Sequence, residues 1–399
     1  MKIGVVFTGF SGSTVALANA LASDEDYVDL IMLTSSRHKL INFEALEVYG
    51  TFPRLCIFKQ VNKSNTRGLS HLSNQDRIRL FVNRTPHGEF TGIKSIFNII
   101  IHSLRRILSK IISQQKYDMV ITIGQDMHSA KLSSDLSEYG IINVHSFHEI
   151  FNRFSDNKIS SSVEYAITNK IPIIVHSNYC KKQLERLAKV EFTPNYIPFG
   201  SFDGYSDFNK NDDNILRRLP FNEKYLLAYG YIKDYKGYDI LYDSYMQIKA
   251  KGRLNFKIVI AGSGYVPILD KIKNNEDFIL INEWISNDGT ATLFDKCKAV
   301  VCPYKSASQS GIPQTAFVFN KPVIATNVGA FAEIISNKNG RLVNRFETLY
   351  EAIIELMNKD IDVTIDECYS WSNIKKEYIK LYNSLNKDNP IEAANNVEL

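Results

Sequence analysis

The feature that most constrains the fold is a repeated alternation of short apolar runs with longer segments of helical periodicity. The runs are apolar at nearly every position, as in residues 3–7, 119–123, 141–144, 225–229, 256–261, 278–281 and 299–302. Helical periodicity marks residues 178–187 and 238–250 among others. Continuous apolar runs of this length are typical of parallel strands that are covered by helices on both faces. The chain is therefore expected to be an α/β protein with doubly wound parallel sheets.

Two such domains are expected along the chain. Its 399 residues exceed one ordinary core, since domains of about 150–200 residues are the default. The polar segment 201–224 is interpreted as an interdomain linker, so that the domains span residues 1–205 and 206–365. Residues 50–92 show no regular pattern and are expected to be irregular, and residues 386–399 are expected to form a polar, frayed tail.

Composition excludes several classes of protein. A net charge of +4 is small for this length and gives no case for a nucleic-acid partner. The five cysteines are scattered and lack neighbouring histidines, so no zinc site is predicted and a reducing compartment is favoured. No run of about 18 apolar residues is present, so no membrane span is expected. A cytoplasmic location is predicted.

The stretch from Val300 to Gly311 indicates an anion site. It reads as a buried strand that opens into a loop of small residues, followed by a helix near Pro313. Small side chains allow a phosphate to approach closely, and backbone N–H groups at the start of a helix point toward it. Ligands of doubly wound sheets bind beyond the carboxyl ends of the strands, where this loop is expected to lie.

Several motifs in the same order along the chain resemble the retaining glycosyltransferases of family 4. The matching stretches are residues 148–149, 175–179, 197–200, 228–239, 258–264, 303–329 and 369–374. The resemblance implies the GT-B fold, in which two Rossmann-like domains face each other across a cleft. It also implies that residues 366–385 form a C-terminal helix that crosses back to the first domain.

The resemblance assigns most of the donor site to the second domain. Lys236 matches a lysine that contacts the diphosphate of a nucleotide sugar, while the family's companion arginine aligns with Tyr231; Lys233 is a candidate replacement cation. Backbone N–H groups of Ser310 and Gly311 are expected to hold the diphosphate. Further donor-binding candidates are Gly262, Gly264, Glu283, Trp284, Ile285, Ser308, Gln309 and Thr315.

The chain departs from the family's best-known motif, a pair of glutamates separated by seven residues. These positions are occupied by Ala307 and Thr315. Thr315 retains a hydroxyl for a ribose, whereas Ala307 offers no polar side-chain atom, and Gln309 is expected to take over some contact with the sugar. The phosphate half of the site is therefore expected to be kept and the sugar half to be rewritten.

Polar residues after strands of the first domain complete the predicted site. The turn with Gly9, Ser11 and Gly12 is expected to border the donor, and the candidate catalytic residues are Asp126, His148 and Glu149, together with Lys236. Near them, His145 is equally well interpreted as a structural histidine. The resemblance implies reaction on one face of the sugar without a protein nucleophile, and no metal is required.

The predicted function is retaining, hexosyltransferase-type transfer from a nucleotide sugar to a glycan or lipid-linked oligosaccharide, as in lipopolysaccharide O-antigen or capsule assembly. Residues 93–112 combine a wide apolar face with basic residues. They are a candidate peripheral contact with the inner face of a membrane, although packing on the sheet explains the pattern equally simply. The alternatives are a GT-B nucleotide-sugar epimerase or hydrolase, and a non-catalytic GT-B partner subunit.

Overall fold

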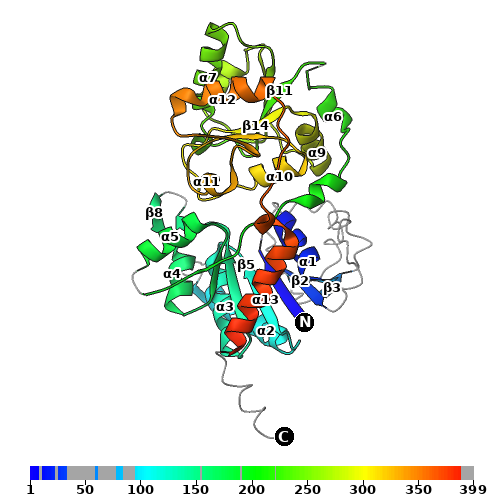
Figure 1. The fold of residues 1–399 in the computed structure, drawn as a ribbon. Helices are drawn as coiled ribbons and strands as arrows, with labels where there is room; N and C mark the ends of the chain where they lie inside the picture. The colour runs from blue at the N-terminus through cyan, green and yellow to red at the C-terminus, as the bar shows by residue number, and fades with distance from the viewer. Residues whose placement is uncertain are drawn as a thin grey trace, which may run out of the picture. The chain divides into compact units, whose positions relative to one another are not determined.

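The structure is a computed structural model with two compact units. It describes residues 1–8, 11–22, 26–33, 59–61, 78–83, 95–152, 155–188, 191–220 and 222–387. The first unit comprises Met1–Gly200 and the C-terminal segment from Cys368, and the second comprises Ser201–Glu367 (Figure 1).

The first unit is built on a sheet with the order β10-β9-β6-β5-β1-β2-β4-β3. Its strands are β1 (Lys2–Phe7), β2 (Tyr27–Leu33), β3 (Lys59–Val61), β4 (Ile78–Asn83), β5 (Met119–Ile123), β6 (Asn143–Phe147), β9 (Ile173–Val175) and β10 (Asn195–Tyr196). All neighbouring strands are parallel except β3 and β4. A separate antiparallel pair, β7 (Phe151–Asn152) and β8 (Ser155–Ile159), follows β6.

Helices cover both faces of this sheet. They are α1 (Ser11–Leu21), α2 (Ser95–Ser113), α3 (Met127–Glu138), α4 (Ser161–Thr168), α5 (Asn178–Leu187) and α13 (Trp371–Lys387). On one face, α1 and α13 lie side by side and bury residues such as Leu21 and Tyr378 against Val5 (Figure 1). On the other, α2 and α3 bury Leu108 and Leu132. The C-terminal helix therefore belongs to the core of the first unit.

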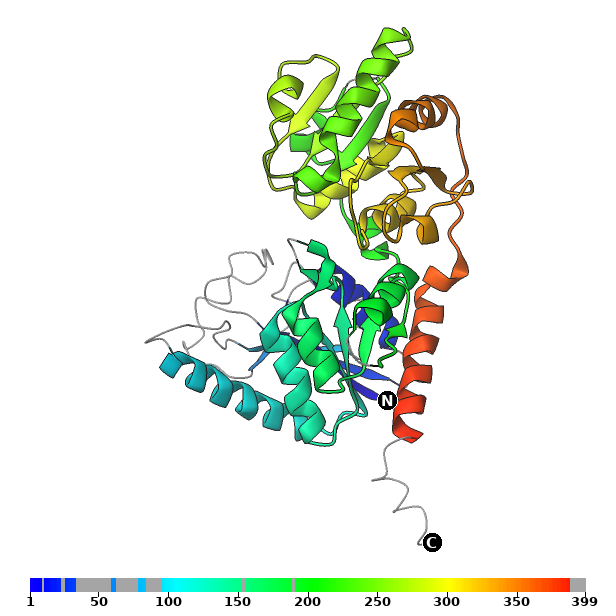
Figure 2. The same ribbon diagram turned by 90° about the vertical axis from the view of Figure 1, so that its left-hand side faces the viewer.

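Helix α2 packs as an ordinary helix of the fold. Helix α2 lies beside α3 (Figure 2). Leu108 and Ile112 are fully buried, and Arg105 pairs with Asp135 of α3 at 2.7 Å. Arg106 also pairs with Asp135. Two basic residues of the 93–112 segment, Arg105 and Arg106, are thus paired within the unit. Among the described residues, no helix combines the length and the apolarity that crossing a membrane requires.

The second unit has a parallel sheet with the order β13-β12-β11-β14-β15-β16. Its strands are β11 (Tyr225–Tyr229), β12 (Lys257–Ala261), β13 (Phe278–Ile281), β14 (Ala299–Cys302), β15 (Val323–Thr326) and β16 (Gly340–Val343). Numbered within the unit, this is the order 3-2-1-4-5-6 of the Rossmann fold. The predicted doubly wound α/β class is confirmed in both units.

Helices again cover both faces. They are α6 (Asp213–Leu216), α7 (Tyr238–Ala250), α8 (Leu269–Ile272), α9 (Asn287–Lys296), α10 (Ile312–Val318), α11 (Phe331–Ile334) and α12 (Leu349–Asn358), with short 3-10 turns η5 (Asp203–Asp207), η6 (Asp234–Lys236), η7 (Phe346–Thr348) and η8 (Glu367–Tyr369). Alternate strand residues face opposite ways: Ile258 packs with α7, α8 and α12, and Val259 with α9, α10 and α11. These runs are apolar throughout because both faces are covered.

The structure corrects three sequence predictions. The segment 201–224 is no free linker, because Tyr205, Phe208 and Ile215 pack into the core of the second unit. Within residues 50–92, β3 and β4 join the first sheet, so this part is not wholly irregular. The strand expected at 141–144 is β6, which begins at Asn143 and continues to Phe147 because all five residues are buried.

Candidate active site

The strand order of the second unit places its topological switch point between β11 and β14. From β11 the sheet grows first toward β12 and β13, and then in the opposite direction from β14. At such a switch point, the loops after the two central strands part and leave room for a ligand. The loops that meet here are residues 230–237 and 303–311. They are joined by a backbone hydrogen bond of 2.7 Å from Lys305 N to Tyr235 O.

Lys236 is the buried cation at this switch point. Its side chain is only 6% exposed, and its ammonium donates to the carbonyl of Tyr229 at 3.0 Å and lies 5.0 Å from the ring centre of Tyr304. Within the described part of the chain, no carboxylate pairs with it. Burial, and to a smaller extent the nearby charge of Lys233, lowers the pKa of Lys236 to about 8. A buried ammonium without a counter-ion is costly unless an anion joins it.

The neighbouring lysines differ in how they are compensated. Lys305 pairs with Asp239 at 2.8 Å and with Asp234 at 3.1 Å, which raises its pKa. Lys233 is exposed and, among the described residues, has no ion-pair partner. Uncompensated positive charge therefore comes from Lys233 and Lys236, as an anion site requires.

The loop before α10 is held close to Lys236. A side chain at Gly230 would have its Cβ 2.8 Å from the Lys236 Nζ and 3.8 Å from Ile312 Cδ1, so both residues border the same spot. Ser310 Oγ accepts from the backbone N–H of Ile312 at 3.3 Å. Gly311 is the residue that caps α10. Ser310 and Gly311 thus lie at the switch point beside Lys236.

The remaining polar residues of this loop are largely enclosed. Ser308 and Thr315 are buried, and the Thr315 hydroxyl donates to Gly311 O at 3.0 Å. With that proton committed within α10, Thr315 has only lone pairs left for a ribose hydroxyl. Gln309 is half-buried. The loop packs tightly on the next turn, since a Cβ at Gly329 would lie 1.6 Å from Ala307 O.

The glycines after β12 are required by the protein's own backbone. Gly262 has φ +144° and Gly264 has φ +142°, which side-chain-bearing residues rarely adopt. A Cβ at Gly262 would lie 2.1 Å from Gly230 O, and one at Gly264 would lie 2.2 Å from Ile232 O. Close chain packing therefore explains both glycines before any nucleotide is considered.

The segment after β13 presents one exposed ring beside another. Trp284 is 54% exposed and Tyr231 is 47% exposed, and their ring centres are 6.1 Å apart. Glu283 pairs with Arg218 at 2.7 Å, which lowers the pKa of the carboxyl, while Ile285 is buried. The free surface here is aromatic, and the carboxylate of Glu283 is already engaged.

In the first unit, candidate residues gather at the carboxyl ends of β1, β5 and β6, which are neighbours in the sheet. Asp126 caps α3 by accepting from Ser129 N at 2.9 Å, and its other oxygen accepts from Thr8 at 2.9 Å. Ser11 and Gly12 begin α1. Gly9 lies outside the described residues. The structure therefore places Asp126 beside the end of β1 and gives it a capping role.

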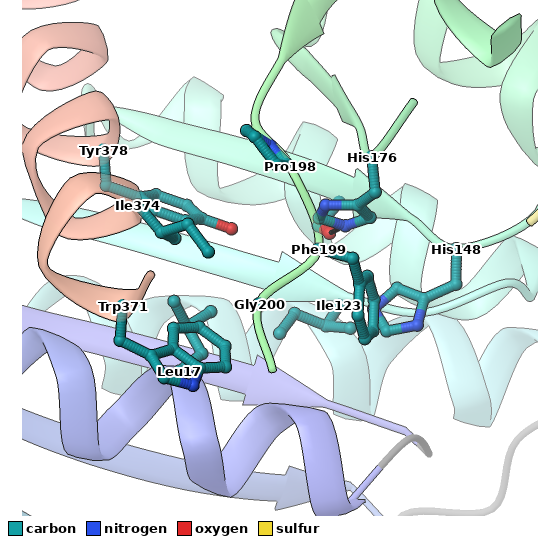
Figure 3. Close-up of a pocket in the computed structure, with 11 residues that line it drawn as sticks. Leu17, Ile123, His148, His176, Pro198, Phe199, Gly200, Trp371, Ile374 and Tyr378 are labelled. Carbon is teal, nitrogen blue, oxygen red and sulfur yellow. Dashed lines mark hydrogen bonds between the residues drawn. The ribbon is translucent and has the colours of Figure 1, made fainter. Parts of the chain in front are cut away.

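His148 lies in an aromatic cluster that lines a small cavity of about 20 Å³ (Figure 3). Its ring contacts Phe199 and His176 edge to face, with centres 4.8 Å and 5.1 Å away. Burial, and secondarily the nearby His176, lower the pKa of His148 well below its ordinary value. Residues Trp371, Ile374 and Tyr378 of α13 close the other side. His148 is therefore neutral and held by packing.

His176, which sequence reasoning did not select, fixes the geometry of this cluster. Its Nδ1 is 2.9 Å from Ile197 O, and because a carbonyl only accepts, Nδ1 carries the hydrogen. Nε2 then accepts from the Ser146 hydroxyl at 2.7 Å. Burial lowers the pKa of His176 to about 4, so the ring stays neutral. In the sequence, the only indication that His176 belongs to this cluster is its position directly after β9.

His145 and Glu149 have structural roles that their sequence positions alone did not decide. His145 bonds to Gly124 O and Ser133 Oγ, each at 3.0 Å, and burial lowers its pKa to about 4, which decides for the structural interpretation. The Glu149 carboxylate accepts from the N–H groups of Ile150 and Phe151. In the described part of the chain, no group of three or more potential ligand residues could hold a metal.

Known proteins resemble the chain in its second unit and in its fold. Residues 223–359 match the family model described as Glycosyl transferases group 1. An uncharacterized glycosyltransferase of Methanocaldococcus jannaschii is 27% identical over 327 residues, which cover 77% of this chain and 85% of that protein. Residues 223–359, which match the family model, contain Lys236 and the loop before α10.

Solved structures resemble the whole chain. Sucrose-phosphate synthase from Thermosynechococcus elongatus superposes with a TM-score of 0.64 at 15% identity, covering 97% of this chain and 100% of that chain. UDP-GlcNAc 2-epimerase from Methanocaldococcus jannaschii gives 0.59 at 14% identity, covering 96% and 100%. The fold is GT-B. Together, the matched domain and this fold support a GT-B glycosyltransferase.

Proposed function

We propose that the protein is a retaining glycosyltransferase that moves a hexose from a nucleotide sugar to a glycan acceptor. The observation that carries the proposal is Lys236, an ammonium buried at the switch point of a Rossmann-type sheet with no carboxylate partner in the described part of the chain. The group 1 match over residues 223–359 indicates which ligand class would compensate it.

The chemistry of transfer explains why such a site suits a nucleoside diphosphate. When the bond between sugar and diphosphate breaks, negative charge grows on the terminal phosphate. A preorganised cation in a low-dielectric site stabilises that charge more than it stabilises the intact donor. With a pKa of about 8, Lys236 is mostly protonated at pH 7, and Lys233 adds a second charge at the rim.

For the acceptor side, the proposal assigns a binding role to the first unit. His148 is neutral and can exchange hydrogen bonds with hydroxyl groups of a sugar without a charge penalty. In a same-face retaining reaction, the departing phosphate takes the proton of the acceptor hydroxyl, so no protein nucleophile and no metal are needed. We place the reaction in the cytoplasm at the inner face of the membrane, in assembly of a lipid-linked surface polysaccharide.

Binding experiments test this proposal directly. The protein and its Lys236→Ala variant would be titrated by calorimetry with UDP-, GDP- and dTDP-sugars, with the exposed Lys338→Ala as control. We expect one nucleotide class to bind to wild type and control, and Lys236→Ala to weaken it by at least about tenfold, as loss of a charged hydrogen bond predicts. Equal binding by Lys236→Ala refutes the site, and no binding by wild type refutes the function.

Product analysis separates transfer from the epimerase alternative, which the fold likeness to UDP-GlcNAc 2-epimerase keeps relevant. The bound nucleotide sugar would be incubated with and without an oligosaccharide acceptor and followed by NMR. Transfer predicts an acceptor-dependent product with the anomeric configuration of the donor. A changed sugar formed without acceptor identifies an epimerase or hydrolase instead.

A further inference from the structure

Phe202 packs directly on the loop that carries the proposed phosphate contacts. A Cβ at Gly311 would lie 2.7 Å from Phe202 Cε2 and 3.0 Å from Cζ, and no other residue provides one of its three nearest atoms. The ring therefore lies against the backbone of Gly311 where any side chain would intrude. This contact joins two segments far apart in sequence within the second unit.

The ring is itself held in place by its own segment. The carbonyl of Phe202 accepts from Tyr205 N at 2.9 Å, which starts η5, and the rings of Phe202 and Tyr205 are 6.3 Å apart. Tyr205 in turn packs against Phe208 and the core beneath. Phe202 is thus anchored on the body of the unit, and Gly311 rests on that anchor.

The contact also lies next to Lys236. Ile312, which follows Gly311, reaches the same spot at Gly230 that the Lys236 ammonium borders. A shift of Gly311 would therefore move the loop relative to the cation. Because electrostatic binding of a diphosphate depends on donors held in fixed positions, small displacements of this loop are expected to reduce affinity.

We infer that Phe202 is a positioning residue for the nucleotide-sugar site, and that it acts by fixing Gly311 and Ser310 relative to Lys236. This inference rests on the proposed function, since it concerns the same site. Phe202 acts through the loop rather than through the ligand. Gly311 has φ −78° and ψ −5°, which any residue adopts, so the absence of a side chain there is explained by the ring and not by the backbone.

A double-mutant cycle tests the inference. Dissociation constants of UDP, GDP and dTDP would be measured for wild type, Phe202→Ala, Gly311→Ala and the double variant, with melting temperatures recorded in parallel. Each single change is expected to weaken the best-binding diphosphate on the order of tenfold, the size of a modest packing error. The double variant should bind no more weakly than the weaker single variant, because both changes break one contact.

Control variants separate positioning from general destabilisation. Phe202→Tyr keeps the ring and should bind within about twofold of wild type. Phe208→Leu alters the same aromatic segment away from Gly311, so it should lower the melting temperature without changing affinity. Phe202→Leu replaces Phe202→Ala in the cycle if the latter does not fold.

The possible results distinguish failure of the role proposed for Phe202 from failure of the proposed function on which that role rests. If wild type binds a diphosphate, Lys236→Ala loses it and Phe202→Ala binds normally, only the role of Phe202 is refuted. Independent effects that multiply to about a hundredfold in the double variant also refute it. If wild type binds none of the three diphosphates, the proposed function and the inference fall together.

Discussion

Replacing Lys236 by Met should stabilise the protein while removing its ligand. Burial lowers the pKa of Lys236 from 10.5 to about 8, and at about 1.4 kcal/mol per pKa unit the buried charge costs about 3 kcal/mol at pH 7. Met matches the length of the side chain but leaves Tyr229 O without its donor, a loss of about 1 kcal/mol. The net expectation is a gain of about 2 kcal/mol in the free energy of unfolding.

The gain should depend on pH in a defined direction. Between pH 8 and 10.5 the unfolded chain keeps a proton on this lysine that the folded chain has released, so wild-type stability rises with pH in this window. The advantage of Lys236→Met should therefore shrink by about 2 kcal/mol between pH 7 and pH 9.5. Groups that do not interact with Lys236 titrate equally in both proteins, so the difference reports on Lys236 and its immediate neighbours.

Urea unfolding at pH 7 and pH 9.5 measures both quantities. The exposed Lys338→Met on the same unit serves as the control, and its stability difference from wild type should stay flat. A Lys236→Met variant that is less stable than wild type at pH 7, or whose advantage does not change with pH, would show that the ammonium is already compensated. Lys236 would then not be the unpaired cation that an anion site requires.

Three other predictions concern the pH dependence of nucleotide binding, the close packing of Gly262 and the ion pair of Arg105. Since only protonated Lys236 attracts a diphosphate, the dissociation constant of the bound nucleotide should rise toward about tenfold per pH unit above pH 8, measured by calorimetry. Gly262→Ala places a Cβ 2.1 Å from Gly230 O at φ +144° and should cost on the order of 2–4 kcal/mol in thermal unfolding; a loss below about 0.5 kcal/mol would contradict the geometry. Arg105→Ala leaves Asp135 buried beside α2 and should cost about 3–5 kcal/mol by chemical denaturation, whereas a neutral effect would show that Arg106 suffices.

Local hydrogen bonds within the first unit account for two of the candidate carboxylates, which are therefore not expected to take part in the chemistry. Asp126 caps α3, and Glu149 accepts two backbone N–H groups. Their sequence positions after strands are those of site residues, yet local hydrogen bonds account for both carboxylates. Position at a strand end is therefore a weaker indicator of chemistry than burial of a charge that has no partner.

Sequence alone determined the class of fold and the place of the proposed phosphate-binding residues. Buried strands are apolar along their whole length, and helices carry their own period, so both are visible from neighbours along the chain. The strands at 119–123, 225–229, 278–281 and 299–302 and the helices at 178–187 and 238–250 have the predicted bounds. Lys236 was recognisable because it follows the first strand of its unit in a family motif.

Only the tertiary structure decided what surrounds that lysine. Pairing of β11 with β14 brings residues 303–311 beside residues 230–237, although they are far apart in sequence. It also buries Lys236 without an acid, gives Lys305 two acidic partners, and lays Phe202 on Gly311. Periodicity specifies which residues are buried, but burial alone does not say which strands become neighbours. Whether a lysine has an acidic partner, and what the ring of Phe202 contacts, depends on which strands are neighbours. The fold therefore decides both.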